Sequence, residues 1–383
     1  MSGTTNTQMP LPNGDTLLLK RHPLRANERL QAWDGADLHL LEQFHSKAAD
    51  HSSKILVVND NFGALTLGLI KYDLSIWGDS YIALQSGLAN YQLNFNAKPS
   101  YKIFRSIRVS NPNFDLIAMK IPKNHDLFAA QLCELRTTIS SKAEVFAAIM
   151  AKDLKKSLVE QLARLGFAVT VSEAYKKSRI LRVGIANNPG HSEFNKDYSS
   201  YREFKIPPHN LIVKSLPGVF SAKKPDEGGL LLSSYIGESR SGIIIDIGCG
   251  NGLLSVPAAI QNPKATIVAI DDSYRAVEST KASFIANNIS LQNHHFIVSN
   301  CLDGVDYQGD LILCNPPFHL GRSLDYTLAQ RMFAAAKYAL SEAGELLVVG
   351  NRHLNYHIHL KRYFARVKTI SKHPKFVVFR CQH

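Results

Sequence analysis

The sequence has no long apolar run and few cysteines. No segment approaches the roughly 18 consecutive apolar residues that a membrane-spanning helix requires. The five cysteines are scattered and none forms a Cys-x-x-Cys pair: Cys133, Cys249, Cys301, Cys314 and Cys381. Such pairs mark metal and redox sites, so we expect no metal ion and reduced core thiols in a cytoplasmic location. Because the chain lacks a long apolar run, we expect no membrane association.

The length and the first residues of the chain set further limits. With 383 residues, the chain is long enough for two domains, each with its own hydrophobic core. Residues 1–14 are polar and lack the apolar stretch of a secretory signal peptide. We expect them to form a loose tail.

The chain is basic in both halves. Residues 1–200 carry 24 Lys and Arg against 18 Asp and Glu, and residues 201–383 carry 20 against 14. Each half therefore contributes +6 to the net charge of +12. This balance fits a nucleic-acid partner that both halves contact, although composition alone also fits an ordinary lysine-rich surface.

The most informative motif is Asn315-Pro316-Pro317-Phe318, which follows the apolar run 311–314. The run predicts a buried strand that ends at the asparagine, where two prolines stop the hydrogen-bond ladder. In open α/β sheets, ligands bind at this end of the strands. The Asn315 side-chain oxygen and the Pro316 carbonyl can each accept one N–H of a planar amino group, while Phe318 stacks on the ring.

A second motif is the glycine-rich turn after an apolar strand, Asp246-Ile247-Gly248-Cys249-Gly250-Asn251-Gly252. Its Gly-x-Gly-x-Gly spacing differs from the Gly-x-Gly-x-x-Gly of dinucleotide-binding proteins. Glycines allow positive φ and let the backbone approach a ligand closely. Asp246 would repel a pyrophosphate and better suits a cationic ligand, such as S-adenosylmethionine.

Two further predicted strands end in polar residues. The strand 265–270 ends at Asp271, which follows Gly252 by 19 residues, the distance at which an acidic side chain meets a ribose diol. The strand 296–299 ends at Asn300, whose amide suits an adenine edge. Each residue alone also fits a turn or a helix cap, but the ordered set at successive strand ends favours a binding site.

These motifs carry a resemblance to a known family. Residues 205–383 resemble a class I S-adenosylmethionine-dependent methyltransferase with the Asn-Pro-Pro-Phe motif of exocyclic amino-group methylation. The segment 216–221 is similar to the lead-in of rRNA guanine-N2 methyltransferases. Through further matches at 30–34, 61–65, 78–81 and 351–354, the whole chain resembles the ribosomal RNA large subunit methyltransferase G family.

The resemblance implies a reaction, a cofactor and a set of site residues. The implied reaction moves a methyl group from S-adenosyl-L-methionine to the exocyclic N2 amine of a guanine in 23S rRNA. The implied catalytic residues are Asn315, Pro316 and Phe318. The implied cofactor-binding residues are Asp246, Gly248, Cys249, Gly250, Asp271, Asn300 and Phe220. We expect the protein to be a monomer.

The N-terminal half repeats the order of these motifs without their chemistry. The strand 54–60 precedes a loop, residues 61–64, that has one glycine instead of three. Asp79 after the next strand parallels Asp271. Lys120, which cannot accept a hydrogen bond, stands in place of Asn315. Phe62 in the loop would crowd a nucleoside.

The predicted fold is therefore α/β, with two tandem Rossmann-like methyltransferase domains, the N-terminal one degenerate. Residues 1–186 form the degenerate domain and are expected to bind RNA, the polar stretch 187–204 is the linker, and residues 205–383 form the catalytic domain. One candidate RNA contact is the basic cluster Lys176, Lys177, Arg179 and Arg182.

Three other functions remain open at this point. A guanine-N2 methyltransferase of 16S rRNA has the same architecture, and only the N-terminal matches favour the large subunit. A protein glutamine N5-methyltransferase uses a similar motif, but the basic duplicate domain argues against it. A catalytically dead RNA-binding scaffold is disfavoured by the intact C-terminal motifs.

Overall fold

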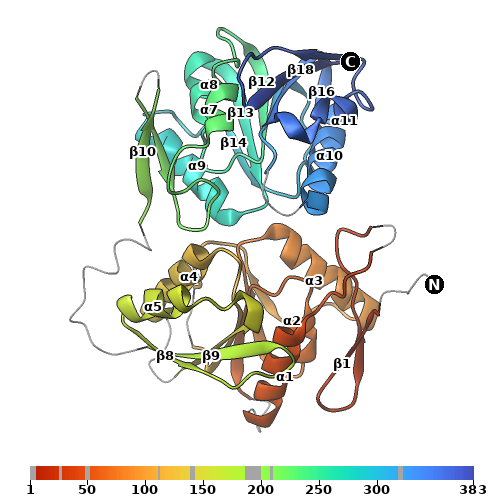
Figure 1. The fold of residues 1–383 in the computed structure, drawn as a ribbon, viewed down its shortest axis with the longest axis vertical. Helices are drawn as coiled ribbons and strands as arrows, with labels where there is room; N and C mark the ends of the chain where they lie inside the picture. The colour runs from red at the N-terminus through yellow and green to blue at the C-terminus, as the bar shows by residue number, and fades with distance from the viewer. Residues whose placement is uncertain are drawn as a thin grey trace. The chain divides into compact units, whose positions relative to one another are not determined.

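The computed structural model describes residues 6–25, 28–47, 52–110, 113–138, 143–185, 200–207, 210–317 and 322–383. The chain divides into two compact units, residues 1–200 and 201–383 (Figure 1). Phe318 and residues 187–199 of the predicted linker lie outside the described residues. The exact domain boundaries at 186 and 204 stay a prediction.

The first unit alternates strands and helices, and its predicted strands correspond to β3, β4 and β6. Its elements are β1 (Gln8–Pro10), β2 (Thr16–Leu18), α1 (Gly35–Lys47), β3 (Lys54–Val58), α2 (Ala64–Gly68), β4 (Asp73–Trp77), α3 (Tyr81–Asn94), β5 (Lys102–Phe104), β6 (Leu116–Lys120), α4 (His125–Thr138), β7 (Glu144–Met150), η1 (Ala151–Asp153), α5 (Lys156–Arg164), β8 (Phe167–Val171) and β9 (Ser178–Ile185).

The second unit repeats this alternation after a hairpin. Its elements are β10 (Arg202–Ile206), β11 (Leu211–Ser215), α7 (Glu227–Ser233), β12 (Ser241–Ile247), α8 (Ser255–Gln261), β13 (Lys264–Asp271), α9 (Tyr274–Ala286), β14 (His295–Val298), β15 (Gly309–Cys314), α10 (Arg322–Ala339), β16 (Leu340–Asn351), η3 (Arg352–Leu354), α11 (Tyr356–Leu360), β17 (Arg366–Thr369) and β18 (Phe376–Gln382).

The two main sheets have the same strand order. The first unit has β5-β4-β3-β6-β7-β9-β8 and the second has β14-β13-β12-β15-β16-β18-β17. In both, the first five strands pair in parallel and the last two pairings are antiparallel. The chain order reverses between β12 and β15, which is where ligands bind in such sheets. The repeated order confirms the predicted tandem α/β architecture.

Strand pairing aligns the two sheets residue by residue. The last residue of β12 faces Cys314 in β15, and the last residue of β3 faces Met119 in β6. The next positions are Asn315 in the second unit and Lys120 in the first. Lys120 therefore occupies the place of Asn315, as the sequence predicts.

The same alignment corrects one predicted correspondence. The last residue of β12 also faces Ile270, and the last residue of β3 faces Trp77. The residues that follow are Asp271 and Gly78. Gly78, and not Asp79, is thus the counterpart of Asp271, so the first unit has no side chain at the position of the Asp271 carboxylate.

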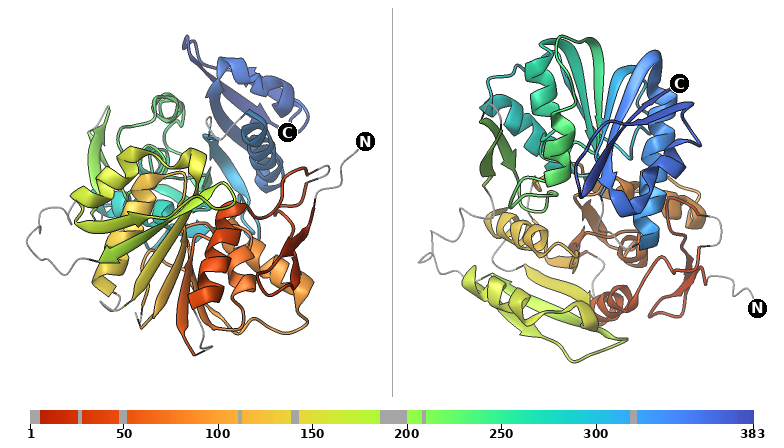
Figure 2. Two further views of the ribbon diagram at one scale, coloured as in Figure 1. Left: turned by 60° about the horizontal axis from the view of Figure 1, so that its bottom comes forward. Right: turned by 45° about the horizontal axis from the view of Figure 1, so that its top comes forward.

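Helices flank both sheets on both faces (Figure 2), and the side chains of the central strands are buried. In the second unit, α7, α8 and α9 lie on one face and α10 and α11 on the other. The apolar side chains 311–314 of β15 are all 0% exposed, as expected for a parallel strand covered on both faces. Burying each stabilises the fold by about 1.5–3 kcal/mol. No helix among the described residues is long and apolar enough to cross a membrane.

Candidate active site

The glycine-rich loop after β12 is held in a conformation that favours glycine. Gly248, Gly250 and Gly252 have φ angles of 81°, 58° and 87°. The backbone N–H groups of Gly248 and Cys249 donate to the Ile270 carbonyl at 2.8 and 2.9 Å, which ties the loop to β13. A Cβ atom on Gly250 would meet nothing within 4 Å. The backbone is therefore open to a ligand at this point.

Asp246, the second-last residue of β12, is buried with one oxygen unused. Its exposed fraction is 1%. Its Oδ2 accepts from the Ser255 hydroxyl at 2.5 Å, while Oδ1 has no hydrogen-bond partner among the described residues. Burial raises the pKa of the Asp246 carboxyl to about 7, and the nearby Asp271 charge adds to this. A cation placed beside Oδ1 would restore the ionised form.

Asp271 connects the glycine-rich loop to the following helix. Its Oδ2 accepts from the Gly250 N–H and its Oδ1 from the Ser273 N–H, both at 2.9 Å. Ser273 in turn caps α9 by accepting from the Ala276 N–H at 3.0 Å. The carboxylate is thereby fixed at the end of β13, and a carboxylate oxygen can accept from a ligand hydroxyl in addition to a backbone N–H.

Asn300, just beyond β14, also has a buried acceptor. Its Nδ2 donates to Asp303 Oδ2 at 2.6 Å. Its Oδ1 has no partner among the described residues. Asp303 thus fixes the amide with its oxygen available, and an amide oxygen suits an amino donor such as that of adenine.

Cys249 and Phe220 lie at the margins of this arrangement. The Cys249 thiol is buried and accepts from the Thr280 hydroxyl at 3.4 Å. Burial raises its pKa well above the usual value, so it is an inert core thiol. Phe220 lies in the turn after β11 and is 47% exposed. The exposed ring can cover a bound ligand.

Asn315 follows β15 and faces a partner that the sequence did not reveal. Its Nδ2 donates to Asp226 Oδ2 at 3.0 Å. Its Oδ1 is enclosed and has no partner among the described residues. The following Pro316 is buried. The predicted third member, Phe318, lies outside the described residues.

Sequence reasoning found the strand-end residues and missed the side chains that hold them. The missed residues are Asp226, Ser255 and Asp303. Asp226 had one detectable feature, because an aspartate before a helical segment is typical of an N-cap. Nothing in the spacing pointed to its contact with Asn315, which is 89 residues away.

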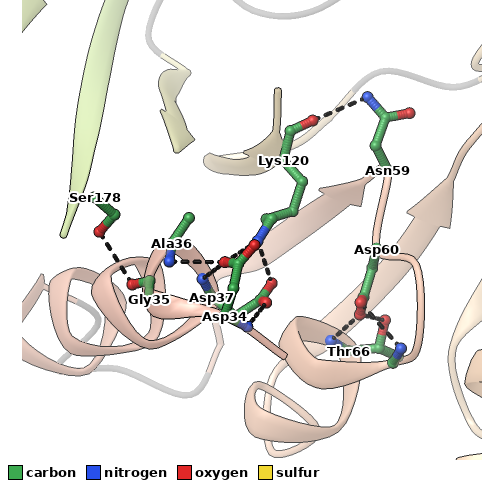
Figure 3. A network of polar contacts seen from close by, with 10 residues as sticks. Asp34, Gly35, Ala36, Asp37, Asn59, Asp60, Thr66, Lys120 and Ser178 are labelled. Atoms are coloured by element: carbon green, nitrogen blue, oxygen red, sulfur yellow. Dashed lines mark hydrogen bonds and ion pairs between the residues drawn. The ribbon is translucent and has the colours of Figure 1, made fainter. Parts of the chain in front are cut away.

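The first unit has an internal ion cluster where the second has Asn315 (Figure 3). The Lys120 ammonium lies 2.6 Å from Asp34 Oδ1 and 3.0 Å from Asp37 Oδ1. Burial alone would lower the pKa of Lys120, but the two carboxylates overcome this and raise it. The lysine therefore stays charged and pairs within its own unit.

Asp60 also forms its hydrogen bonds within the first unit, where it holds the loop that follows β3. Its Oδ1 accepts from the Gly63 N–H at 3.0 Å, and its Oδ2 accepts from the Thr66 N–H and hydroxyl, both at 2.8 Å (Figure 3). A cavity of about 420 Å³ remains at this edge, and Phe62 and Arg21, stacked at 4.6 Å, help to line it. The carboxylates that line this cavity are paired with groups of the protein, whereas Asp246 Oδ1 has no hydrogen-bond partner among the described residues.

Among the described residues, no group of three or more His, Cys, Asp or Glu side chains is arranged to hold a metal ion. The acceptors of the second unit are instead spread over four neighbouring strand ends. This arrangement suits an extended organic ligand that carries a positive charge.

Each unit matches a known protein family. The methyltransferase small domain family matches residues 210–380, and the RLMG N-terminal domain family matches residues 6–187. A solved T. thermophilus 16S rRNA N2 methyltransferase, in complex with AdoMet and guanosine, superposes with a TM-score of 0.74. It covers 98% of this chain and 97% of its own, at 20% identity, and so shares the tandem fold.

Curated relatives match over nearly the whole chain. The ribosomal RNA large subunit methyltransferase G of Shewanella amazonensis is 35% identical, covering 94% of this chain and 95% of the relative. That of Vibrio cholerae is 32% identical, covering 95% and 96%. The methyltransferase motifs and S-adenosylmethionine as cofactor are consistent with these matches. The chain belongs to the ribosomal RNA large subunit methyltransferase G family of S-adenosylmethionine-dependent methyltransferases.

Proposed function

We propose that this protein methylates the exocyclic N2 amine of one guanine in large-subunit (23S) rRNA. The observation that carries the proposal is the buried Oδ1 of Asn315, which has no partner among the described residues and is followed in sequence by the Pro316 carbonyl. Two adjacent acceptors at a strand end match the two N–H groups of a planar amine. The names of the relatives favour the large subunit.

The cofactor is assigned to the neighbouring strand ends. Asp246 Oδ1 would take the positive charge of S-adenosylmethionine, Asp271 the ribose hydroxyls and Asn300 Oδ1 the adenine amino group. The loop Gly248 to Gly250 gives close backbone approach, and Phe220 would cover the bound molecule. When bound, S-adenosylmethionine supplies an electrophilic methyl group.

The role of the protein in the reaction is to prepare the amine. The lone pair of a guanine N2 is delocalised into the ring, so the amine is a weak nucleophile. Acceptance of its two hydrogens by Asn315 and Pro316 turns the lone pair out of the ring plane and stabilises the positive charge that develops on nitrogen. The nitrogen gains a bond to carbon, the sulfur–carbon bond breaks, and one N–H proton leaves to water.

The first unit is assigned to RNA binding. Its sheet matches that of a methyltransferase, yet its polar strand-end groups are paired internally, as Lys120 is with Asp34. A basic unit whose strand-end charges are already paired is available to hold rRNA and present the target. The target base must leave its stack, which costs a few kcal/mol in a duplex and less in a loop.

A second target is supported by one observation. The solved protein with the same tandem fold over nearly its full length acts on 16S rRNA. Its 20% identity supports a common fold, whereas the relatives named for the large subunit are 32–35% identical. The 23S target is therefore the main proposal and the 16S target the alternative.

The test is methyl transfer from labelled cofactor to deproteinised 23S and 16S rRNA, to assembled subunits and to total protein. Nucleoside analysis by mass spectrometry should find N2-methylguanosine in 23S rRNA. Asn315→Ala is the matched control, because it removes one acceptor and should lower the rate about 10²–10³-fold. Label in 16S rRNA would transfer the proposal to the small subunit, and label in protein glutamine would refute it.

A further inference from the structure

One carboxylate joins the base-binding asparagine to a helix start. Asp226 Oδ2 accepts from the Gly229 N–H at 2.6 Å as the N-cap of α7. The same oxygen accepts from Asn315 Nδ2 at 3.0 Å. Two hydrogen bonds from different elements thus converge on one atom, which fixes both the helix and the amide.

We propose that Asp226 is the positioning residue that sets the orientation of the Asn315 amide, so that Oδ1 faces the incoming amine. The inference rests on the proposed function, because it explains how that function obtains its acceptor. A carboxylate accepts hydrogen bonds, so it selects the N–H₂ end of the amide and turns the oxygen the other way. The Oδ1 of Asn315, which has no partner within the part of the chain that the structure describes, agrees with this orientation.

The flipped amide would oppose the reaction. It would point two N–H donors at the N–H donors of the substrate and place the Asn315 oxygen against the Asp226 carboxylate. Both contacts are repulsive, and neither would stabilise positive charge on the amine. An asparagine without a fixed neighbour exchanges between the two orientations, so its orientation must be imposed from outside.

The packing at Gly229 shows that this contact is built into the fold. A Cβ atom there would lie 2.6 Å from Leu253 Cδ2, 3.2 Å from Asn315 Nδ2 and 3.3 Å from Asp226 Oδ2. A side chain at this position would have to displace the end of Leu253 and press against the amide of Asn315. The start of α7 and the end of β15 are therefore fitted to each other around the shared Asp226 oxygen.

The test separates orientation from helix capping. Asp226→Ser keeps a good N-cap, but its shorter side chain no longer reaches Asn315. We expect kcat for N2 methylation to fall roughly 10- to 100-fold, which corresponds to an acceptor that is correctly oriented in about 1–10% of the molecules. KM for rRNA and the Kd for S-adenosylmethionine should stay near wild type. Asp226→Asn retains an acceptor oxygen and should recover most of the rate.

A double-mutant cycle shows whether Asp226 acts through Asn315. In an Asn315→Ala background, Asp226→Ser should change single-turnover rates by less than about twofold, since the group it positions is gone. An equal loss in both backgrounds would overturn the inference, and so would an unchanged kcat in Asp226→Ser alone.

A substrate-free readout keeps the inference apart from the proposed function. In protein labelled with 15N-asparagine, the side-chain N–H₂ signal of Asn315 is identified by its absence in Asn315→Ala. Its hydrogens should be protected from exchange in the wild type and lose that protection in Asp226→Ser. If the wild type fails to methylate guanine, the proposed function fails, and this measurement still decides the orientation. Equal protection in both proteins would refute the role of Asp226.

Discussion

At the scale of single residues, the site is defined by acceptors that the protein leaves without partners. Asp246 Oδ1, Asn300 Oδ1 and Asn315 Oδ1 are buried and unpartnered among the described residues. Each such group costs about 1–3 kcal/mol. Their neighbours Ser255, Asp303 and Asp226 each bind the other end of the group. The cost is offset when ligands supply the missing donors, so the site is preorganised for binding.

Asp246 predicts a pH dependence for cofactor binding. Its pKa is raised to about 7 in the free protein. A positively charged ligand beside it favours the ionised form and lowers that pKa, so binding below pH 7 releases a proton. Affinity for S-adenosylmethionine should be constant above about pH 7.5 and fall up to about tenfold per pH unit below pH 7.

Titration calorimetry at pH 6 in buffers of different ionisation enthalpy measures this proton directly. The observed heat should vary with the buffer at pH 6 and much less at pH 8. The raised pKa of Asp246 also affects stability. A carboxyl whose pKa is higher in the folded than in the unfolded state stabilises the fold below its unfolded pKa, and this contribution is lost as pH rises through 7. Buffer-independent heats at pH 6 would show that Asp246 does not meet the charge of the cofactor.

At the scale of secondary-structure elements, the ion cluster of the first unit joins the start of α1 to the end of β6. Burial raises the pKa of Asp37 to about 6. The Asp34 carboxyl is half exposed but bonded to Lys120, and its pKa is lowered. In the first unit, the position that corresponds to Asn315 is thus occupied by Lys120, whose ion pairs link β6 to the start of α1.

Lys120→Met should destabilise the protein by about 3 kcal/mol at pH 8, because it leaves two carboxylates without their cation. The estimate is at the low end for buried pairs, since Asp34 is half exposed. Without Lys120 the pKa of Asp37 rises further, so the loss should shrink as pH is lowered to 5. Chemical denaturation at both pH values measures it. Lys156→Met, at a side chain 92% exposed, is the control and should change stability by less than about 0.5 kcal/mol.

The predicted basic cluster near residue 180 divides into two kinds of residue. Arg179 donates to the Ser172 carbonyl at 2.8 Å, and Arg182 pairs with Glu144. Lys176 and Lys177 are exposed at the tip of a two-residue turn, with φ angles of 47° and 59°. The lysines are therefore the stronger candidates for phosphate contact.

Replacing the turn with Lys176→Asn and Lys177→Gly removes both charges and supplies the residues that this turn prefers. Protein stability should hold or increase, while rRNA affinity falls. The slope of log affinity against log salt should decrease by about 0.7–0.9 for each phosphate that the variant no longer neutralises. The charge-retaining pair Lys176→Arg and Lys177→Arg should keep the slope. An unchanged slope in the neutral variant would exclude this turn from the RNA-binding surface.

At the scale of the whole molecule, one fold is used twice for different purposes. Both sheets share their strand order, and each unit has its own buried core. Unpartnered carboxylate and amide oxygens at the strand ends occur, among the described residues, in the second unit. Duplication has therefore kept the scaffold and changed the site.

The division of roles predicts one cofactor per chain. Calorimetry should give a stoichiometry of one, and fragment 201–383 should bind S-adenosylmethionine as tightly as the full chain. The fragment should lose most activity on rRNA, because the first unit supplies affinity through phosphate contacts. Two cofactors per chain would contradict the prediction that the first unit binds no cofactor. Full activity of the fragment would contradict its role in RNA binding.

The sequence by itself determined the strands that carry the motifs, the glycine-rich loop and the order of the strand-end residues. These features depend on local rules: an apolar run makes a buried strand, glycine permits positive φ, and prolines end the ladder at Asn315. Because parallel strands share one carboxyl edge, Asp246, Asp271 and Asn315 were predicted to meet without knowledge of the fold in detail. The sequence predicted Asp79 as the counterpart of Asp271, whereas the true counterpart is the preceding residue, Gly78. The error arose because register is fixed by pairing between strands.

Only the tertiary structure decided which way each polar group points and what holds it. Asp226 and Asn315 are 89 residues apart, and Lys120 and Asp34 are 86 apart. No periodicity or spacing links such pairs, because their distance is set by how whole helices and strands pack. In the second unit, packing places a carboxylate beside the Asn315 Nδ2, and the Asn315 Oδ1 has no partner among the residues that the structure describes. In the first unit, packing places carboxylates beside the Lys120 ammonium. The strand ends of the second unit thereby keep acceptors without partners among the described residues, whereas the carboxylates that line the first unit's cavity are paired within that unit.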